Sequence, residues 1–334
     1  MSEKQVPRIG IVTLGGTIAA TPRSDSDELV SPQMKGADLV AAVPQLTEFA
    51  RVETTEFCNI PSGDLTIADV LELAREISSR GFESHDGIVV TQGTDTLEET
   101  AFALGLLIDN SRPVVVTGAM RNPSMPGADG PANLLSAVQV AGSSDAARRG
   151  VMVVMNDEIH AARWVRKTHS SSTAAFTSPS AGPIGVVVEG RPRFFGPAYL
   201  MPTLRSGPPS SVPAVALVRV VLGDDERILN QVESLGYAGL VVEAYGAGHV
   251  PSRMVDALSR LAATIPVVLA SRTGVGAVLA STYGFAGSES DLLSHGLISA
   301  GDLDGLKSRI LLSLSLGAGH DTDQVRELFH SFYE

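Results

Sequence analysis

Three short segments of the sequence together supply small hydroxyl side chains and charged groups that could act in catalysis. Residues 92–96 read QGTDT and place Thr94 and Asp95 directly after an aliphatic run, while residues 14–21 read LGGTIAAT and place Thr17 after two glycines. A threonine hydroxyl is a weak nucleophile unless a base removes its proton, and a lysine can be that base. Lys167, in a third polar segment, supplies such a group, and Asp95 could orient it. These four residues are the candidate catalytic residues.

Each segment also has a structural interpretation, which stays open at this point. The hydroxyls and carboxylate of residues 94–96 could cap the helix that begins at Leu97, and Thr96 with Glu99 has the spacing of a capping box. The glycine pair could form an ordinary turn between a strand and a helix, and Lys167 could be a solvated surface charge. The glycines fit neither the dinucleotide-binding fingerprint nor a P-loop.

The elements that must position these residues alternate between strand and helix. Aliphatic runs without strict alternation are typical of strands buried on both faces, and they occur at residues 9–13, 87–91, 113–117 and 151–155. Apolar stripes of helical period lie between them, at 67–77 and 97–108. This order predicts an α/β fold with a doubly wound, mostly parallel sheet. Ligands bind outside the carboxyl ends of such strands, where the three candidate segments fall.

The same alternation restarts after residue 213 and predicts a second domain. Strands are expected at 214–221, 239–242 and 266–270, and helices at 224–235, at 252–263 and in two stretches near the C-terminus. The intervening segment 196–213 is rich in Pro, Gly and Ser, as connectors are. We therefore expect a large N-terminal α/β catalytic domain over 1–195, a linker over 196–213, and a smaller α/β domain over 214–334.

Composition narrows the class of protein. The 334 residues are 44% hydrophobic, and the formal net charge of −12 comes from scattered acids, which argues for solubility and against a nucleic-acid partner. The single cysteine, Cys58, excludes an internal disulfide and a multi-thiolate metal site, and its apolar neighbours suggest a buried, inert thiol. No apolar run approaches the roughly 18 to 20 residues that span a membrane. The polar N-terminus that leads directly into a strand indicates a cytoplasmic protein.

Five motifs together resemble those of the bacterial-type L-asparaginase/glutaminase family. They are GGTIA at 15–19, GTDTLEETA at 93–101, GAMR at 118–121, ADGPANL at 128–134 and VVMND at 153–157. The resemblance runs in order through nearly the whole chain. It implies a threonine amidohydrolase that converts L-asparagine to L-aspartate and ammonia through an acyl-enzyme. It also implies that no metal or organic cofactor is used.

The resemblance assigns roles to individual residues. It implies that Thr17 is the nucleophile and that Thr94, Asp95 and Lys167 form a relay, although which threonine attacks first is left open. Ser62 would hold the α-carboxylate of the substrate, and Asp95 would meet its α-ammonium group. Gly63 stands next to Ser62, where some members carry glutamine. Family members are typically homotetramers, built as dimers of dimers whose active sites are shared between subunits.

The sequence also departs from the family pattern. The loop over 21–32 contains no tyrosine, where members usually carry one that assists the first threonine, and Leu29 falls near that place. Its composition suits either a mobile lid or an ordinary surface loop. In the C-terminal half no acid precedes Tyr283, where many members present a glutamate. Glu289 or Glu243 could substitute for it.

Three further positions each allow a functional and a structural interpretation. Arg272 could bind a carboxylate or form a structural ion pair. His249 stands where the family often has asparagine and reads as a polar loop residue rather than a catalytic one. The absent side chain at Gly63 could enlarge the pocket. The departures leave two alternatives open: a related amidase that prefers glutamine or D-asparagine, and a weak, amino-acid-binding homologue.

Overall fold

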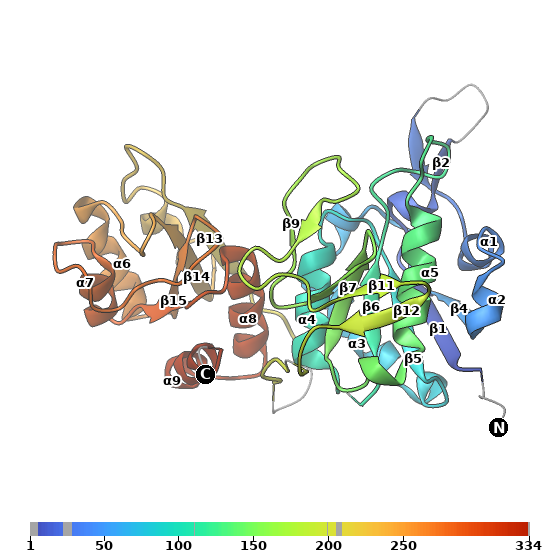
Figure 1. Ribbon diagram of the computed structural model, residues 1–334. Coiled ribbons are helices and arrows are strands. Elements are labelled where there is room, and N and C mark those ends of the chain that lie inside the picture. The colour runs from blue at the N-terminus through green and yellow to red at the C-terminus, as the bar shows by residue number, and fades with distance from the viewer. Residues whose placement is uncertain (1–5, 23–28, 110, 199, 205–208, 333–334) are drawn as a thin grey trace. The chain divides into compact units, whose positions relative to one another are not determined.

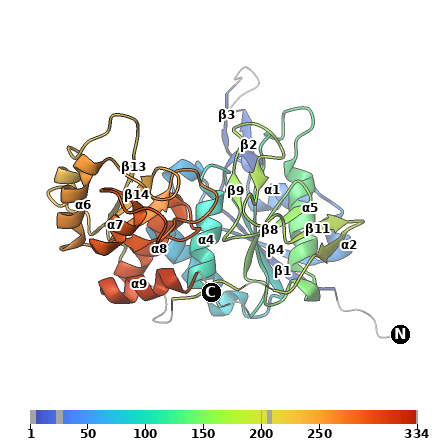
Figure 2. The ribbon, with the colours of Figure 1, turned by 60° about the vertical axis from the view of Figure 1, so that its left-hand side comes forward.

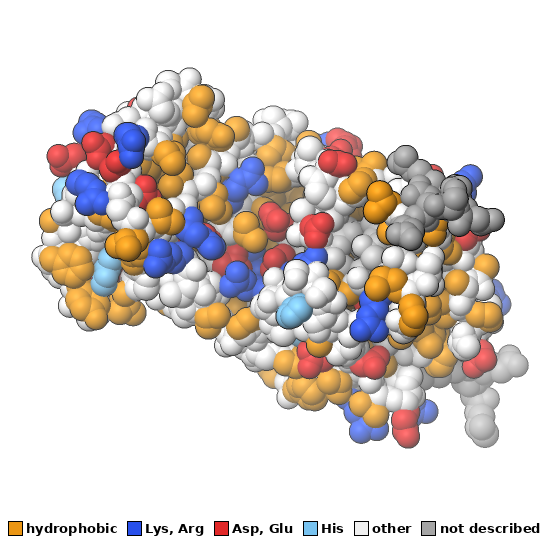
Figure 3. All heavy atoms as spheres, turned by 90° about the horizontal axis from the view of Figure 1, so that it is seen from above, with side chains coloured by type: hydrophobic (Ala, Val, Ile, Leu, Met, Phe, Trp, Pro, Cys, Tyr) orange, Lys and Arg blue, Asp and Glu red, His pale blue; other side chains and the backbone are white. Residues whose placement is uncertain are grey.

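A computed structural model describes residues 6–22, 29–109, 111–198, 200–204 and 209–332. The chain divides into two compact units, Met1–Met201 and Pro202–Glu334. Within the described residues, no helix is long and apolar enough to cross a membrane. Acidic and basic side chains are interspersed on the face shown in Figure 3, so the negative charge is not concentrated there.

The first unit is built on an eight-stranded sheet in the order β12-β11-β8-β7-β6-β5-β1-β4. The strands are β1 (Arg8–Thr13), β4 (Arg51–Glu56), β5 (Gly87–Thr91), β6 (Val114–Thr117), β7 (Val151–Met155), β8 (Glu158–Ala161), β11 (Gly185–Val188) and β12 (Arg191–Phe194). The five strands from β4 to β7 are parallel, and β8, β11 and β12 extend the sheet with antiparallel pairs. Every residue of β5, β6 and β7 is buried, as their unbroken aliphatic runs predict.

Helices cover both faces of this sheet (Figure 1). On one face α1 (Gly36–Ala41), α2 (Leu46–Phe49) and α5 (Gly130–Ala141) share a core with alternate strand residues such as Ile9, Val89 and Met152. On the other face α3 (Ile67–Ile77) packs against α4 (Leu97–Leu107). The expected doubly wound, mostly parallel α/β fold is confirmed.

The antiparallel edge was not predicted. A two-residue turn, Asn156-Asp157, joins β7 to β8, and both residues have positive φ, at 52° and 61°. A type I′ turn requires this, and Asn and Asp tolerate it better than most residues. The chain therefore folds back at once after β7 instead of crossing over through a helix.

Short elements complete the first unit. They are the β2 (Ala20–Pro22) and β3 (Val30–Pro32) hairpin, the β9 (Arg166–Lys167) and β10 (Phe176–Thr177) pair, and the 3-10 turns η1 (Thr17–Ala19), η2 (Ser62–Asp64), η3 (Arg80–Phe82) and η4 (Ser144–Ala146). In both Figure 1 and Figure 2, β9 and the β2-β3 hairpin lie at the same end of the sheet. Half of the lid expected over 21–32, residues 23–28, lies outside the described residues.

The second unit holds a four-stranded parallel sheet in chain order, β13 (Val215–Arg219), β14 (Gly239–Ala244), β15 (Val267–Ser271) and β16 (Ile298–Ser299). Its helices are α6 (Val255–Ala262), α7 (Glu289–Ser294), α8 (Gly305–Gly317) and α9 (Thr322–His330), with 3-10 turns η5 (Leu229–Gln231) and η6 (Ser252–Met254). The smaller α/β unit is therefore present, and α8 and α9 match the two helices expected near the C-terminus.

One expected helix is absent. Residues 224–235 form turns around η5 instead of an α-helix. The carboxylate of Asp224 accepts the backbone N–H groups of Val221 and Asp225, and that of Asp225 accepts the N–H of Arg227. Such local bonds between side chains and backbone compete with the helical pattern. The apolar spacing alone did not reveal this competition.

Candidate active site

Two of the predicted segments, those of Thr17 and Thr94, meet the loop that carries Ser62 at the carboxyl edge of the large sheet. In that sheet β1 lies between β4 and β5. The chain adds β4 on one side of β1 and then adds β5, β6 and β7 on the other. Such a reversal creates a crevice between the loops that leave adjacent strands, which is where open α/β sheets bind ligands. The loops after β1, β4 and β5 therefore face one another here.

Glycines allow the backbones of these loops to touch. Gly16 has φ of 86°, and a Cβ atom at this position would clash with the backbone N of Gly93. A Cβ atom at Gly93 would in turn lie 2.7 Å from Ser62 Oγ. The structure thus brings the segment of Thr17 against the segment that leads into Thr94. Thr17 itself is half-buried at the start of η1.

Lys167 bridges the two polar residues of the loop after β5. Its Nζ donates to Thr94 Oγ1 at 2.9 Å and to Asp95 Oδ1 at 2.7 Å. The lysine side chain is 15% exposed and that of Asp95 is 76% exposed, so the ion pair is covered on the lysine side and open to solvent on the aspartate side. Strand β9 holds the lysine in place, because Lys167 pairs with Phe176 of β10.

Ser62 is the first residue of η2 and is buried. Its Oγ accepts the backbone N–H of Asp95 at 3.2 Å, which leaves the hydroxyl hydrogen to be donated to another group. A Cβ atom at the neighbouring Gly63 would meet nothing within 4 Å. The space that a longer side chain would fill is therefore open at Gly63.

The helix cap expected at Thr96 is not formed by its side chain. Thr96 occupies the N-cap position of α4, yet its side chain makes no capping hydrogen bond to the helix. Its Oγ1 donates instead to the carbonyl O of Ser62 at 2.9 Å and accepts from Gln92 Nε2 at 3.0 Å. A tertiary partner thus outcompetes the local cap. By contrast, Thr66 and Asp69 do form the capping box of α3.

A network around Asp129 holds the next loops, and the sequence reading did not assign it a role. The Asp129 carboxylate accepts the backbone N–H groups of Met120 and Arg121. Asn133, one turn later, donates to Gly118 O at 3.0 Å and accepts from the backbone N of Asn156 at 2.9 Å. These residues belong to the GAMR, ADGPANL and VVMND motifs. The shared motifs were the signal that could have identified this network.

Cys58 lies beside the loop after β1, and its Sγ is 3.5 Å from Leu14 O. Burial, with a smaller contribution from the Asp69 carboxylate, raises the pKa of this thiol. The thiol is therefore protonated at neutral pH, as expected of an inert cysteine, but the residue is half-buried and not buried as predicted.

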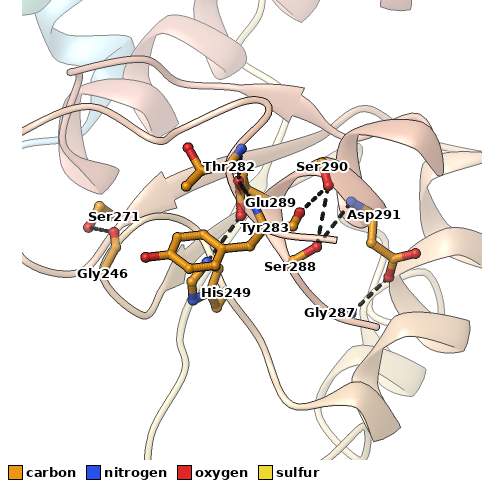
Figure 4. A network of polar contacts seen from close by, with 10 residues as sticks. All are labelled: Gly246, His249, Ser271, Thr282, Tyr283, Gly287, Ser288, Glu289, Ser290 and Asp291. Atoms are coloured by element: carbon orange, nitrogen blue, oxygen red, sulfur yellow. Dashed lines mark hydrogen bonds and ion pairs between the residues drawn. The ribbon is translucent and has the colours of Figure 1, made fainter. Parts of the chain in front are cut away.

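In the second unit Glu289 stabilises its own loop (Figure 4). The side chain is fully buried; Oε1 accepts the N–H groups of Thr282 and Tyr283, and Oε2 lies 3.1 Å from His249 Nε2. Burial alone would raise the pKa of this carboxyl, but the backbone N–H donors outweigh it and leave the pKa below its usual value. Glu243 is also buried, and Arg219 Nε donates to it at 2.6 Å. Both carboxylates are thus held by partners within the second unit, and the substitution of either one for the missing glutamate stays a prediction.

The other residues singled out in this unit make structural contacts. The ring of His249 packs edge-on to Tyr283 and Phe285, with centroids 4.8 and 5.0 Å away. Arg272 donates to Val220 O and lies over the ring of Tyr245. These contacts are with a carbonyl and an aromatic ring, whereas an ion pair was one of the two expectations.

A groove of about 620 Å³ runs along β13 in the second unit. None of the predicted site residues lines it. The position of the candidate site therefore depends on side-chain geometry and not on cavity size. Within the described residues, no group of three or more His, Cys, Asp or Glu side chains could hold a metal ion.

The two halves of the chain match two family models. Residues 8–199 match the N-terminal asparaginase domain, and residues 214–329 match the C-terminal domain of glutaminases and asparaginases. The chain belongs to the asparaginase family.

Individual relatives resemble the chain over nearly its whole length. A probable periplasmic L-asparaginase of Haemophilus influenzae is 32% identical, covering 98% of this chain and 93% of the relative. A glutaminase-asparaginase of Acinetobacter glutaminasificans is 33% identical, covering 96% and 98%. The crystal structure of a probable cytoplasmic L-asparaginase from Campylobacter jejuni superposes with a TM-score of 0.87 at 35% identity, covering 97% of this chain and 99% of that one.

Proposed function

We propose that the protein is an L-asparaginase, which hydrolyses the side-chain amide of L-asparagine to L-aspartate and ammonia through a threonine acyl-enzyme. One observation carries the proposal: the Lys167 ammonium bridges Thr94 and Asp95 in a loop whose glycine packs against the glycine before Thr17. Family membership supports it, since the relatives described above are named as asparaginases.

In the proposed first step, Thr17 Oγ attacks the carbonyl carbon of the amide. Backbone N–H groups of the loops at the strand ends stabilise the oxyanion, and the proton that Thr17 loses passes to the amide nitrogen, which leaves as ammonia. The product is a β-aspartyl ester of Thr17.

In the second step water attacks the ester carbonyl. In the proposal Thr94 relays a proton from this water toward the Thr17 oxygen, and the Lys167 ammonium, which donates to Thr94 Oγ1, stabilises negative charge that develops on that atom. Collapse of the tetrahedral intermediate releases L-aspartate and returns the proton to Thr17. Thr17, Thr94 and Lys167 therefore each have a catalytic role in the proposal, and Asp95 is assigned to the relay through its ion pair with Lys167.

Substrate binding is assigned to the same loops. Ser62 donates its free hydroxyl hydrogen to the α-carboxylate, and the exposed carboxylate of Asp95 receives the α-ammonium group. The open space at Gly63 favours a second candidate as well, a related amidohydrolase with a different amide preference such as glutamine or D-asparagine. One relative is named a glutaminase-asparaginase.

We further propose a cytoplasmic homotetramer, a dimer of dimers with shared active sites, which uses no cofactor. The family resemblance supports the assembly and the lack of a cofactor. The cytoplasmic name of the Campylobacter jejuni protein supports the location, whereas the Haemophilus influenzae relative is named periplasmic.

The test is coupled ammonia release by the purified protein from L-asparagine, L-glutamine and D-asparagine. The highest kcat/KM on L-asparagine supports the proposal, and a higher value on either other amide supports the second candidate. The site must discriminate between these substrates by one methylene or one stereocentre. Calorimetric binding of L-aspartate without ammonia release from any of the three would instead identify a binding homologue.

A further inference from the structure

Gln92 and Thr96 form a partly buried chain of hydrogen bonds that ends at Ser62. Gln92 Nε2 donates to Thr96 Oγ1 at 3.0 Å, and Thr96 Oγ1 donates to Ser62 O at 2.9 Å. The Gln92 side chain is fully buried, at 0% exposure. Both the donor and an acceptor site of the Thr96 hydroxyl are therefore in use, which fixes its orientation.

The position of Thr96 makes this chain unusual for its place in the fold. An N-cap threonine normally accepts an N–H of the helix that it precedes, and losing that bond costs stability. Thr96 does not make the capping bond and contacts a residue 34 positions away instead. A half-buried hydroxyl that bonds to a distant loop in place of its own helix has a positional role there.

That role concerns Ser62, which is held from three sides. Thr96 holds its carbonyl O, the backbone N–H of Asp95 holds its Oγ at 3.2 Å, and Gly93 leaves no room for a side chain beside Oγ. The remaining freedom of Ser62 is the direction of its hydroxyl hydrogen. That hydrogen can then be directed toward an anion at the crevice.

We propose that Thr96 and Gln92 are positioning residues that set the Ser62 hydroxyl for the carboxylate of the substrate and thereby control KM. This inference rests on the proposed function and deepens it. Thr96 and Gln92 act through Ser62 and touch no reacting atom, so their loss should weaken binding of substrates that carry an α-carboxylate and spare the chemical step.

The first variant is Thr96→Val, which keeps the side-chain shape and removes the hydroxyl. Loss of one well-aligned hydrogen bond to a charged group corresponds to roughly tenfold or more in affinity. We therefore expect KM for L-asparagine to rise about tenfold while kcat changes by less than about threefold. Thr96→Ser restores the hydroxyl and should restore KM.

Controls separate positioning from general damage. Thr100→Val makes the same change one turn further along α4, at a buried position, and should leave KM unchanged. If Thr96→Val does not fold, Gln92→Met removes the other end of the chain and should raise KM in the same direction. Melting temperatures of all variants show which proteins are folded.

A double-mutant cycle is the decisive test, because Thr96 is proposed to act only through Ser62. In the Ser62→Ala background, Thr96→Val should raise KM no further. An unchanged KM in folded Thr96→Val, a loss in kcat alone, or additive effects on KM would overturn the inference.

Failure of the proposed function can be told apart from failure of this inference. A wild-type protein that releases no ammonia from L-asparagine defeats the asparaginase proposal, and the inference is then tested by calorimetric binding of L-aspartate to wild type and Thr96→Val. Weaker binding to the variant supports positioning, equal binding overturns it, and no binding to the wild type overturns both.

Discussion

His160 should make the first unit less stable in mild acid. It lies on β8 with no exposed surface, and its Nδ1 is 3.0 Å from Ser178 Oγ. Burial lowers the pKa of this imidazole to about 4. In the unfolded chain the same group binds a proton near its ordinary pKa of 6.5. The unfolded state therefore binds more protons between these values, and stability rises with pH across that range.

The size of the effect follows from the two pKa values. Each pH unit between them is worth about 1.4 kcal/mol, so the whole contribution is about 3 kcal/mol. It is fully present above pH 6.5, falls as the pH is lowered, and is lost at about pH 4. At pH 5 about 2 kcal/mol should already be gone. Glu158 Oε2 lies 3.4 Å from His160 Nε2. The Glu158 side chain is 41% exposed, so solvent screens its attraction for the charged ring.

The assay is urea unfolding followed by tryptophan fluorescence at pH 7.5 and pH 5. Trp164 is the single tryptophan and lies in the same unit, four positions from the histidine. Between the two pH values the wild type should lose about 2 kcal/mol more than His160→Gln, whose side chain does not titrate. His330→Gln, at an exposed position, is the matched control. Equal pH dependence in wild type and His160→Gln would refute the reasoning.

Three further predictions concern the site. Lys167→Met should lower kcat for ammonia release by about 100-fold or more, because it removes the group that contacts both Thr94 and Asp95, and steady-state kinetics on folded protein checks this. Gly16→Ala should destabilise the protein by at least about 2 kcal/mol, since a Cβ there meets backbone at positive φ, whereas Gly63→Ala should change stability by less than about 0.5 kcal/mol; thermal melting compares them. Alkylation of Cys58 at pH 8, followed by mass spectrometry, should be slower in native protein than in urea, and equal rates would contradict the raised thiol pKa.

The parallel core of the fold could be predicted because its signal is local. Strands such as Gly87–Thr91 and Val151–Met155 are buried on both faces, so their sequences are unbroken aliphatic runs. The edge strands carry no such signal: β12 reads RPRF and alternates between exposed and half-buried residues. Residues 224–235 form turns instead of the expected helix because the carboxylates of Asp224 and Asp225 accept nearby backbone N–H groups. The spacing of apolar residues does not predict these hydrogen bonds.

The candidate site could also be predicted only in part from the sequence. The loops that carry Thr17 and Thr94 could be predicted, because each follows directly after an aliphatic run that indicates a buried strand. Lys167 is 73 positions from Thr94, and the contact between them depends on the β9 pairing, which spacing alone does not reveal. The spacing of Thr96 to Glu99 favoured a helix cap, but in the folded chain the Thr96 hydroxyl donates to Ser62 O instead.

The most direct test of the central claim is ammonia release from L-asparagine by the wild type, Thr17→Ala and Thr17→Ser, each shown to be folded by its melting temperature. We predict turnover by the wild type, none above background by Thr17→Ala, and partial turnover by Thr17→Ser, which retains a hydroxyl. Wild-type rates in folded Thr17→Ala would contradict a Thr17 acyl-enzyme, and no ammonia from folded wild type would contradict the asparaginase function itself.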